Sequence, residues 1–353
     1  MDKPEEQVDL LTGLLEQYSP TREEQPAVEY LLERMLNMGF NAGIDRVGNA
    51  VGWLGCGPQE LVLLGHIDTV RGRIAVRREG DQLFGRGAVD AKGSLACFVS
   101  AAALAGSVKG WKVTVIGAVG EEGDSRGARF LTGRSAPQAV VIGEPSGWDN
   151  ITLGYKGSAW VDFTYRRPVA HGASYETNAC QSAVDFWNRV TERCKQLNAG
   201  KERMFEQLSP YLQHIDSHSD GFNETAQLKI NFRLPVGIDH EELQALLTES
   251  TLGDESANIH FYEFDPAFRS DKNSPLVRAF LPAIRQQGGK PTFILKSGTA
   301  DMNVVGPAWG CPILAYGPGD STLDHTPDEH ISIQEYMAGI RVLREALLAL
   351  QTD

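Results

Sequence analysis

The sequence predicts an α/β protein: a domain with a mostly parallel sheet, interrupted by an inserted two-layer α+β domain. Up to residue 156, apolar β-branched runs that look like buried strands alternate with helical patterns. Near residue 156 the pattern changes to alternating apolar and polar residues, which is typical of a sheet with one solvated face. The α/β pattern returns after about residue 268. We therefore expect one domain from residues 1–156 and 267–353, and an inserted domain at 157–266.

The first domain opens with two helical patterns. One is an apolar stripe over residues 8–15, and the other begins at an apparent capping box, Thr21 to Glu24, and ends at Gly39. Further helices are expected at 93–105, where small residues dominate, and at 333–350. Apolar runs predict the strands of this domain at 49–54, 61–65, 112–119, 139–142 and 313–316.

The inserted domain is expected to pair an open sheet with helices. Residues 158–165 alternate, with Val161, Phe163 and Tyr165 on one face, and residues 227–234 alternate in the same way. Helical patterns at 180–197 and 241–247 would cover the apolar face of these strands.

Composition excludes several classes of protein. Acidic residues outnumber basic ones by 46 to 33, giving a formal charge of −13, whereas a nucleic-acid binder needs a basic surface. The five cysteines are scattered and form no C-x-x-C pair, which argues against a disulfide scaffold and a structural zinc finger. No apolar run resembles a signal peptide or is long enough to span a bilayer, so we expect a cytoplasmic protein that does not bind membranes.

Side chains that can bind metals follow four of the predicted strands. Open α/β sheets build their sites at the carboxyl ends of strands, so four such endings are hard to explain as four solvated turns. Together with Asp90 in a glycine-flanked loop, they offer ligand types that suit zinc or a similar divalent ion. They are His66 and Asp68 after residues 61–65, Glu121 and Glu122 after 112–119, Glu144 after 139–142, and His325 after 313–316.

The chemistry of these side chains suggests a site with two metals. His66 and His325 would each give one nitrogen to one of the metals, and Asp90 would bridge them. Glu122 and Glu144 would each complete one shell of ligands. Two ions in such a site lie roughly 3.5–4 Å apart and act together on the attacking oxygen and the developing oxyanion.

Two of the carboxylates would serve the site without binding metal. Asp68 follows His66 by two residues on the same strand face, so it would accept the second ring N–H of His66 and fix its tautomer. Glu121 would be left free to take a proton from the attacking water. In isolation, Glu121 and Glu122 also fit a charged turn at a strand end, because glycines flank them.

Six stretches carry a family resemblance: GHIDTV, GRGAVDAKG, VGEEGDSRGAR, VIGEPS, KSGTADMN and DHTPDEHI. In this order they resemble the dinuclear-zinc amidohydrolases and exopeptidases, a family that includes acetylornithine deacetylase, succinyl-diaminopimelate desuccinylase and carboxypeptidase G. The stretches span the chain nearly from end to end. The resemblance implies the ligand set above, bound zinc, and a cis peptide bond after Asp90.

The resemblance also implies roles for the inserted domain. In relatives it is a dimerisation lid that closes over the substrate, so a homodimer or a higher homo-oligomer is expected. His171 matches a histidine that reaches a neighbouring subunit's site, and Arg233 matches an arginine that holds a substrate carboxylate. Gly298 and Thr299 match residues that line the substrate cleft. Without the resemblance, His171 would be a turn histidine, and Arg233 could be a solvated strand arginine.

Within the family, GEPSGWDNITLGYKG and KSGTADMN look most like the hydrolases that release lysine or ornithine from an amino-group carrier protein in lysine and arginine biosynthesis. Such an enzyme cleaves the amide between the amino acid's α-amino group and the γ-carboxyl of the carrier's C-terminal glutamate. The alternative is a small-molecule deacylase acting on N-acetyl-ornithine or N-acetyl-lysine. The ligand set suits zinc, cobalt and manganese. A non-enzymatic protein on a decayed scaffold is disfavoured, because every expected ligand and Glu121 are present.

A basic run follows the first pair of expected site residues and consists of Arg71, Arg73, Arg77 and Arg78. On a chain of negative net charge, this run would give an acidic carrier protein a place to dock. A solvated basic hairpin explains the same residues equally well.

Three other histidines fit structural roles. His214 and His218 are spaced like metal ligands on a helix, yet their surroundings predict a surface loop. His330 is expected to open the next strand or helix, because Ile331 and Ile333 follow it.

Overall fold

The computed structural model describes residues 4–169 and 177–351, which form two compact units. The first unit comprises Met1–Gly154, Ser270–Leu295 and Ala300–Asp353, and the second comprises Tyr155–Arg269 and Lys296–Thr299. The expected insertion at 157–266 did not include the short segment Lys296–Thr299. This segment belongs to the second unit, where the N–H of Lys156 donates to the carbonyl of Lys296 at 3.1 Å.

The first unit is built on a mixed sheet whose four central strands are parallel neighbours. These strands are β6, β3, β7 and β15, and the strands beyond them, β2 and β8, run antiparallel. The expected α/β class with a mostly parallel sheet is confirmed. In spatial order the strands are β1 (Asn41–Ile44), β2 (Ala50–Leu54), β6 (Trp111–Ala118), β3 (Gln59–His66), β7 (Ala139–Gly143), β15 (Ile313–Ala315) and β8 (Asn150–Tyr155), and β14 (Thr292–Lys296) also pairs with β8.

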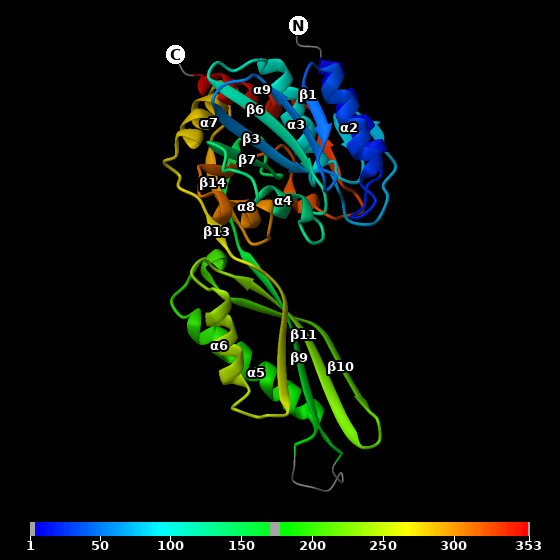
Figure 1. The fold of residues 1–353 in the computed structure, drawn as a ribbon, viewed down its shortest axis with the longest axis vertical. Coiled ribbons are helices and arrows are strands. Elements are labelled where there is room, and N and C mark those ends of the chain that lie inside the picture. The colour runs from blue at the N-terminus through cyan, green and yellow to red at the C-terminus, as the bar shows by residue number, and fades with distance from the viewer. Residues whose placement is uncertain (1–3, 170–176, 352–353) are drawn as a thin grey trace. The chain divides into compact units, whose positions relative to one another are not determined.

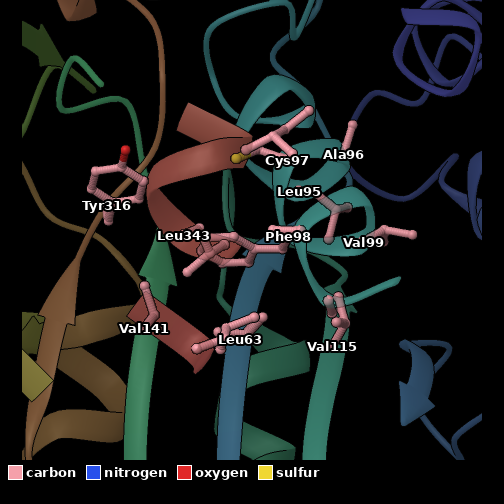
Figure 2. Packing of buried hydrophobic residues seen from close by; sticks show 14 of the residues in the cluster. Leu63, Leu95, Ala96, Cys97, Phe98, Val99, Val115, Val141, Tyr316 and Leu343 are labelled. Carbon is pink, nitrogen blue, oxygen red and sulfur yellow. The ribbon is translucent and has the colours of Figure 1, made fainter. Parts of the chain in front are cut away.

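Helices cover this sheet, and α3 is the most deeply buried of them. Small residues let it lie close to the strands: a methyl group at Gly143 of β7 would lie 2.9 Å from the ring of Phe98. Figure 2 shows Leu95 and Phe98 of α3 packed with Leu63 of β3 and Leu343 of α9. The helices of this unit are α1 (Pro4–Glu16), α2 (Gln25–Asn37), α3 (Lys92–Ala105), α4 (Arg126–Leu131), α7 (Pro275–Gln286), α8 (Asp301–Trp309) and α9 (Ile333–Ala349), with a 3₁₀ turn, η2 (Ser321–Leu323).

A small three-stranded sheet completes the first unit. It consists of β4 (Arg77–Glu79), β5 (Gln82–Phe84) and β16 (His330–Ser332), in the order β16, β5, β4. His330 therefore opens a strand that leads directly into α9, as expected. All five cysteines are free thiols. In the described ranges, no helix combines the length and the apolar character that crossing a membrane requires.

The predicted capping box at Thr21 is wrong. Helix α2 begins four residues later, at Gln25, and its N-cap residue Glu24 makes no side-chain cap bond. The hydroxyl of Thr21 instead donates to Oδ2 of Asp68 at 2.8 Å. A hydrogen bond to a carboxylate is stronger than a bond to a neutral acceptor, so this contact across the chain competes well with local capping.

The second unit is an antiparallel sheet covered by two helices, α5 (Ala179–Leu197) and α6 (His240–Ser250) (Figure 1). The expected alternation is confirmed, because Val161, Phe163 and Tyr165 are buried and the ring of Phe163 stacks on Phe186 of α5 at 3.8 Å. The strand order is β10 (Ser209–Ser219), β11 (Asn223–Leu234), β9 (Gly157–Pro168) and β12 (Ala257–Asp265), with a 3₁₀ turn, η1 (Met204–Glu206). The short strand β13 (Phe268–Arg269) pairs in the larger sheet, next to β8.

The predicted surface loop at His214 and His218 is also wrong. Both side chains are exposed, but they lie on β10, where they pair with Lys229 and Thr225 of β11. Most of β10 is exposed on both faces, so it lacks the apolar alternation by which a half-buried strand is recognised.

The packing of α3 on the sheet leads to a prediction about stability. Leu63→Ala should lower the free energy of unfolding by about 2–5 kcal/mol, because Leu63 is completely buried and its removal leaves a cavity. Leu36→Ala is the matched control, since Leu36 is 51% exposed on α2, and it should change the value by less than about 1 kcal/mol. Chemical denaturation followed by circular dichroism measures both. Equal effects would contradict the packing described here.

Candidate functional site

The four parallel strands at the centre of the first unit end at one edge of the sheet. The register aligns Gly65 of β3 with Gly117 of β6 and with Gly143 of β7, so the residues that follow leave the sheet at the same level. β15 runs parallel beside β7 and leads to His325. All of the expected ligands outside the Asp90 loop therefore start from neighbouring strand ends.

The carboxylate of Asp90 lies between two imidazoles. Its Oδ1 is 3.1 Å from Nε2 of His66, and its Oδ2 is 2.9 Å from Nε2 of His325. The peptide bond between Asp90 and Ala91 is cis, so that expectation is confirmed. Each oxygen of one carboxylate thus faces a different ring nitrogen, which is the arrangement that a bridging ligand requires.

Two glutamates extend this central group, one on each side. Oε1 of Glu122 is 3.0 Å from Nε2 of His325, and Oε1 of Glu144 is 3.9 Å from Nε2 of His66. Ligand atoms of His66, Asp90 and Glu122 all lie within 4.8 Å of one another. The five residues divide into two sets that share Asp90.

Asp68 supports the site in a different way from the one expected. Nδ1 of His66 lies 3.0 Å from the main-chain carbonyl of Asp68, whereas the nearest carboxylate oxygen is 3.7 Å away. The carboxylate is engaged elsewhere, since Oδ1 accepts the N–H of Glu121 at 3.0 Å and Oδ2 accepts the N–H of Glu122 at 3.2 Å. Asp68 therefore fixes the turn that carries both glutamates.

The carbonyl contact still determines the tautomer of His66. A carbonyl oxygen can only accept, so Nδ1 of His66 must carry the proton in this bond. The other nitrogen, Nε2, then faces Asp90 and is the one available to a metal.

The turn after β6 gives its two glutamates different environments. Gly120 has φ +81°, and the chain turns there immediately after the strand ends at Ala118. Glu122 faces His325, whereas Oε2 of Glu121 lies 4.0 Å from Nε2 of His66. Burial, together with the negative charges of Glu144 and Asp301, raises the pKa of Glu121 well above its usual range. Glu121 is therefore a stronger base than an exposed glutamate.

The nearby carboxylates also raise the pKa values of the two imidazoles. Hydrogen bonds to Asp90 and Glu122 raise the pKa of His325 to about 10. Burial opposes protonation of His66, but the neighbouring carboxylates outweigh it and raise its pKa well above the ordinary value. Two imidazoles and a surplus of convergent carboxylates form a donor set that fits divalent ions of the zinc type.

Sequence reasoning missed two residues next to this group. Thr21 donates to Asp68. Its spacing from Glu24 matches a capping box, so the sequence predicted a helix cap instead of this contact. Asp301 is 2% exposed at the start of α8, and burial together with the charge of Asp68 raises its pKa to about 7. An aspartate at a helix start is common, so no signal in the sequence distinguished it.

The four remaining expected site residues are not among the described residues of the first unit. His171 lies outside the described residues. Arg233, Gly298 and Thr299 belong to the second unit. Arg233 and Gly298 line a cavity of about 160 Å³ together with Lys156, Met204, Ser209, Tyr211 and Ser297. Burial lowers the pKa of Arg233, and within the described residues no carboxylate pairs with it.

The basic run carries little unbalanced charge. Arg71 pairs with Glu23, Arg77 with Glu79 and Arg78 with Glu5 at 2.6–3.6 Å. Arg73 has no acidic partner among the described residues, and its guanidinium lies 6.0 Å from the ring centre of Tyr18. Such exposed pairs are weak, but they favour a solvated basic segment over a strong docking surface.

Comparison with known proteins places the chain in a family. The profile of peptidase family M20/M25/M40 matches residues 62–349. A [LysW]-lysine hydrolase of Deinococcus radiodurans is 40% identical and covers 93% of this chain and 92% of its own. A [LysW]-lysine/[LysW]-ornithine hydrolase of Saccharolobus islandicus is 30% identical, with 96% and 94% covered.

Solved structures agree in fold. An M20 family metallo-carboxypeptidase from Sulfolobus solfataricus has a TM-score of 0.78 at 18% identity, and 99% of each chain is covered. Aminopeptidase PepT from Bacillus cereus has a TM-score of 0.81 at 17% identity, with 98% of each chain covered. The resemblance seen in the six sequence stretches is confirmed, and the chain belongs to peptidase family M20/M25/M40.

Proposed function

We propose that this protein is a hydrolase with two divalent metals that frees lysine or ornithine from the C-terminal glutamate of an amino-group carrier protein. The observation that carries the proposal is the carboxylate of Asp90 between His66 and His325, with Glu121 beside it. The two relatives named above act on [LysW]-linked lysine or ornithine according to their names and align over nearly the whole chain, which supports the choice of substrate.

The donor set would divide between two ions. His66, Asp90 and Glu144 would hold one ion, and His325, Asp90 and Glu122 would hold the other, as the distances around Asp90 suggest. Zinc suits this mixture of imidazole and carboxylate best, and cobalt and manganese accept the same ligands. Bound ions would supply positive charge to the attacking water and to the carbonyl oxygen of the amide.

The residues of the chain itself move the proton. Glu121 takes a proton from the water that attacks the γ-carbonyl carbon of the glutamate. As the C–N bond breaks, Glu121 gives this proton to the departing α-nitrogen of lysine or ornithine. Asp68 keeps Glu121 in place, because its carboxylate accepts the main-chain N–H of Glu121.

The second unit offers a cationic pocket for the substrate. A γ-linked glutamate at the end of a carrier keeps its α-carboxylate free, and Arg233 presents a guanidinium without an acidic partner in the described ranges. We propose that Arg233 binds this carboxylate and that Gly298 and Thr299 lie beside the bound substrate. We also propose that His171 reaches a neighbouring subunit's site to stabilise the oxyanion, in a homodimer or a higher homo-oligomer, and that the protein is cytoplasmic, which suits its five free thiols.

The first prediction separates the base from the ligands. Glu121→Gln should lower kcat by about 10²–10⁴-fold because the carboxylate that takes the proton is gone. The variant should still bind two equivalents of zinc, measured by atomic emission after dialysis. Glu23→Gln is the control, because Glu23 is an exposed glutamate of the same unit and should leave both values unchanged. A Glu121→Gln enzyme of normal activity would overturn the mechanism.

The second prediction concerns protons at the metal site. The pKa of His325 is about 10, so its ring is protonated at pH 7 and must lose a proton when an ion binds, and the carboxylates around His66 shift its pKa in the same direction. Zinc titration by calorimetry in two buffers of different ionisation enthalpy should show proton release. Affinity should fall as pH falls, by roughly tenfold per pH unit for each proton displaced. Binding without proton release at pH 7 would contradict the described site.

The third prediction distinguishes the carrier substrate from a small acetylated one. The kcat/KM for lysine on the carrier's C-terminal glutamate should exceed that for N-acetyl-lysine and N-acetyl-ornithine by at least tenfold. Arg233→Ala should raise KM for the carrier substrate and leave KM for N-acetyl-lysine unchanged. The acyl part of the carrier substrate is a glutamate with a free α-carboxylate, whereas the acetyl group has no carboxylate for Arg233 to bind. Arg166→Ala, on the exposed end of β9, is the control. Preference for the acetylated substrates would favour the deacetylase alternative.

A further inference from the structure

Glu329 is a buried glutamate that binds the main chain of the Asp90 loop. Its side chain is 1% exposed, and Oε1 accepts the N–H of Val89 at 3.0 Å and the N–H of Asp90 at 3.1 Å. Both donors are main-chain groups, one at Asp90 itself and one directly before it. The orientation of the Asp90 backbone is thus fixed from outside its own loop.

The charge of Glu329 is balanced by Arg86. Oε2 of Glu329 accepts from Nη1 of Arg86 at 2.7 Å, and Nε of Arg86 donates to the carbonyl of Gly72 at 3.0 Å. Both side chains are almost completely buried, so the pair is shielded from water. Removal of either partner would leave an uncompensated buried charge and would strongly destabilise the fold. Arg86 also belongs to the Asp90 loop, so all three hydrogen bonds to the Glu329 carboxylate come from residues 86–90.

Glu329 also ties this loop to the segment that carries His325. The carbonyl of Glu329 accepts the N–H of Gly85 at 3.3 Å, and Glu329 follows His325 by four residues. Across the site, His325 and Asp90 face each other at 2.9 Å. Glu329 therefore connects the two segments that carry Asp90 and His325, whose side chains must stay close together.

We propose that Glu329, held by Arg86, is a positioning residue that keeps the two oxygens of Asp90 aimed at two different metal ions. It acts through the main chain, because a carboxylate only two bonds from Cα moves with its backbone. This inference rests on the proposed metal site and adds a residue that contacts neither an ion nor the substrate. Supporting contacts behind metal ligands of this kind typically change metal affinity about 10–100-fold.

The test compares zinc affinity with the stability of the metal-free protein. Glu329→Gln keeps one oxygen acceptor but places an uncharged amide against Arg86, so zinc affinity should fall about 10–100-fold in competition with a chromophoric chelator. Thermal unfolding of the metal-free variant, followed by circular dichroism, reports any purely structural effect. A lower melting temperature with unchanged zinc affinity would overturn the proposal.

A second variant removes the unpaired charge. In Arg86→Gln/Glu329→Gln the amide oxygen of residue 329 can still accept from Val89 and Asp90, and no buried guanidinium is left without a carboxylate. We expect this pair to regain most of the zinc affinity, whereas Arg86→Gln/Glu329→Ala, which lacks the acceptor, should not. Equal affinities of the two double variants would overturn the proposal even if Glu329→Gln alone folds poorly.

Asp81→Asn is the matched control. Asp81 accepts from Ser332 and Gln334, so it anchors the chain just after Glu329 without touching the Asp90 loop. Its substitution should leave zinc affinity unchanged, and a loss equal to that of Glu329→Gln would show general loosening and contradict the proposal. Failure of the wild-type protein to bind zinc would instead overturn the metal site itself and the inference with it.

Discussion

The carboxylate of Asp90 reaches two imidazoles from opposite sides, at 3.1 Å and 2.9 Å, and much of the first unit serves to hold this contact. His66 comes from the end of β3, and His325 comes from a segment that follows β15. These strands are brought to one edge because β6, β3, β7 and β15 are parallel neighbours. A shift of any of these elements would separate donors that must lie within a few ångströms.

The carboxylates of the site repel one another, so the buried side chains around it must be held in place by hydrogen bonds and ion pairs. Asp68 accepts from two main-chain N–H groups and from Thr21, and Glu329 pairs with Arg86. Lys92, also buried, donates to the carbonyls of Leu14 and Gln17, which anchors the start of α3 to the end of α1. Each of these buried polar side chains is hydrogen-bonded, as low-dielectric surroundings demand. At the site itself the carboxylates outnumber the cationic groups, and this excess of negative charge suits the site to divalent cations.

The strand ends and the ligand types could be predicted from the sequence because they depend on local patterns. An apolar β-branched run followed by His66 or Glu144 is visible in a few residues. The spatial order of the strands depends on contacts between distant segments, so local patterns made the convergence of the ligands plausible without fixing which ligands are neighbours. The resemblance to a known family supplied the roles of His171 and Arg233, which no spacing indicates.

The residues that sequence reasoning misjudged act over long separations. Thr21 has the spacing of a helix cap, but its acceptor is 47 residues away in sequence. Asp68 was expected to accept from the ring of His66 through its carboxylate, yet its main-chain carbonyl makes this contact and the carboxylate accepts from the turn at Glu121, which belongs to another strand end. Glu329 lies 239 residues from Asp90, so no local pattern could reveal that contact. For Thr21 and the Asp68 carboxylate, a tertiary hydrogen bond replaced the local one that the sequence suggested.

Anomalous diffraction at the zinc absorption edge, from crystals of the zinc-loaded protein, tests the central claim most directly. The account predicts two anomalous peaks roughly 3.5–4 Å apart. One should lie against His66 and Glu144 and the other against His325 and Glu122, with one oxygen of Asp90 bound to each. A single peak, or two peaks that do not share Asp90, would contradict it.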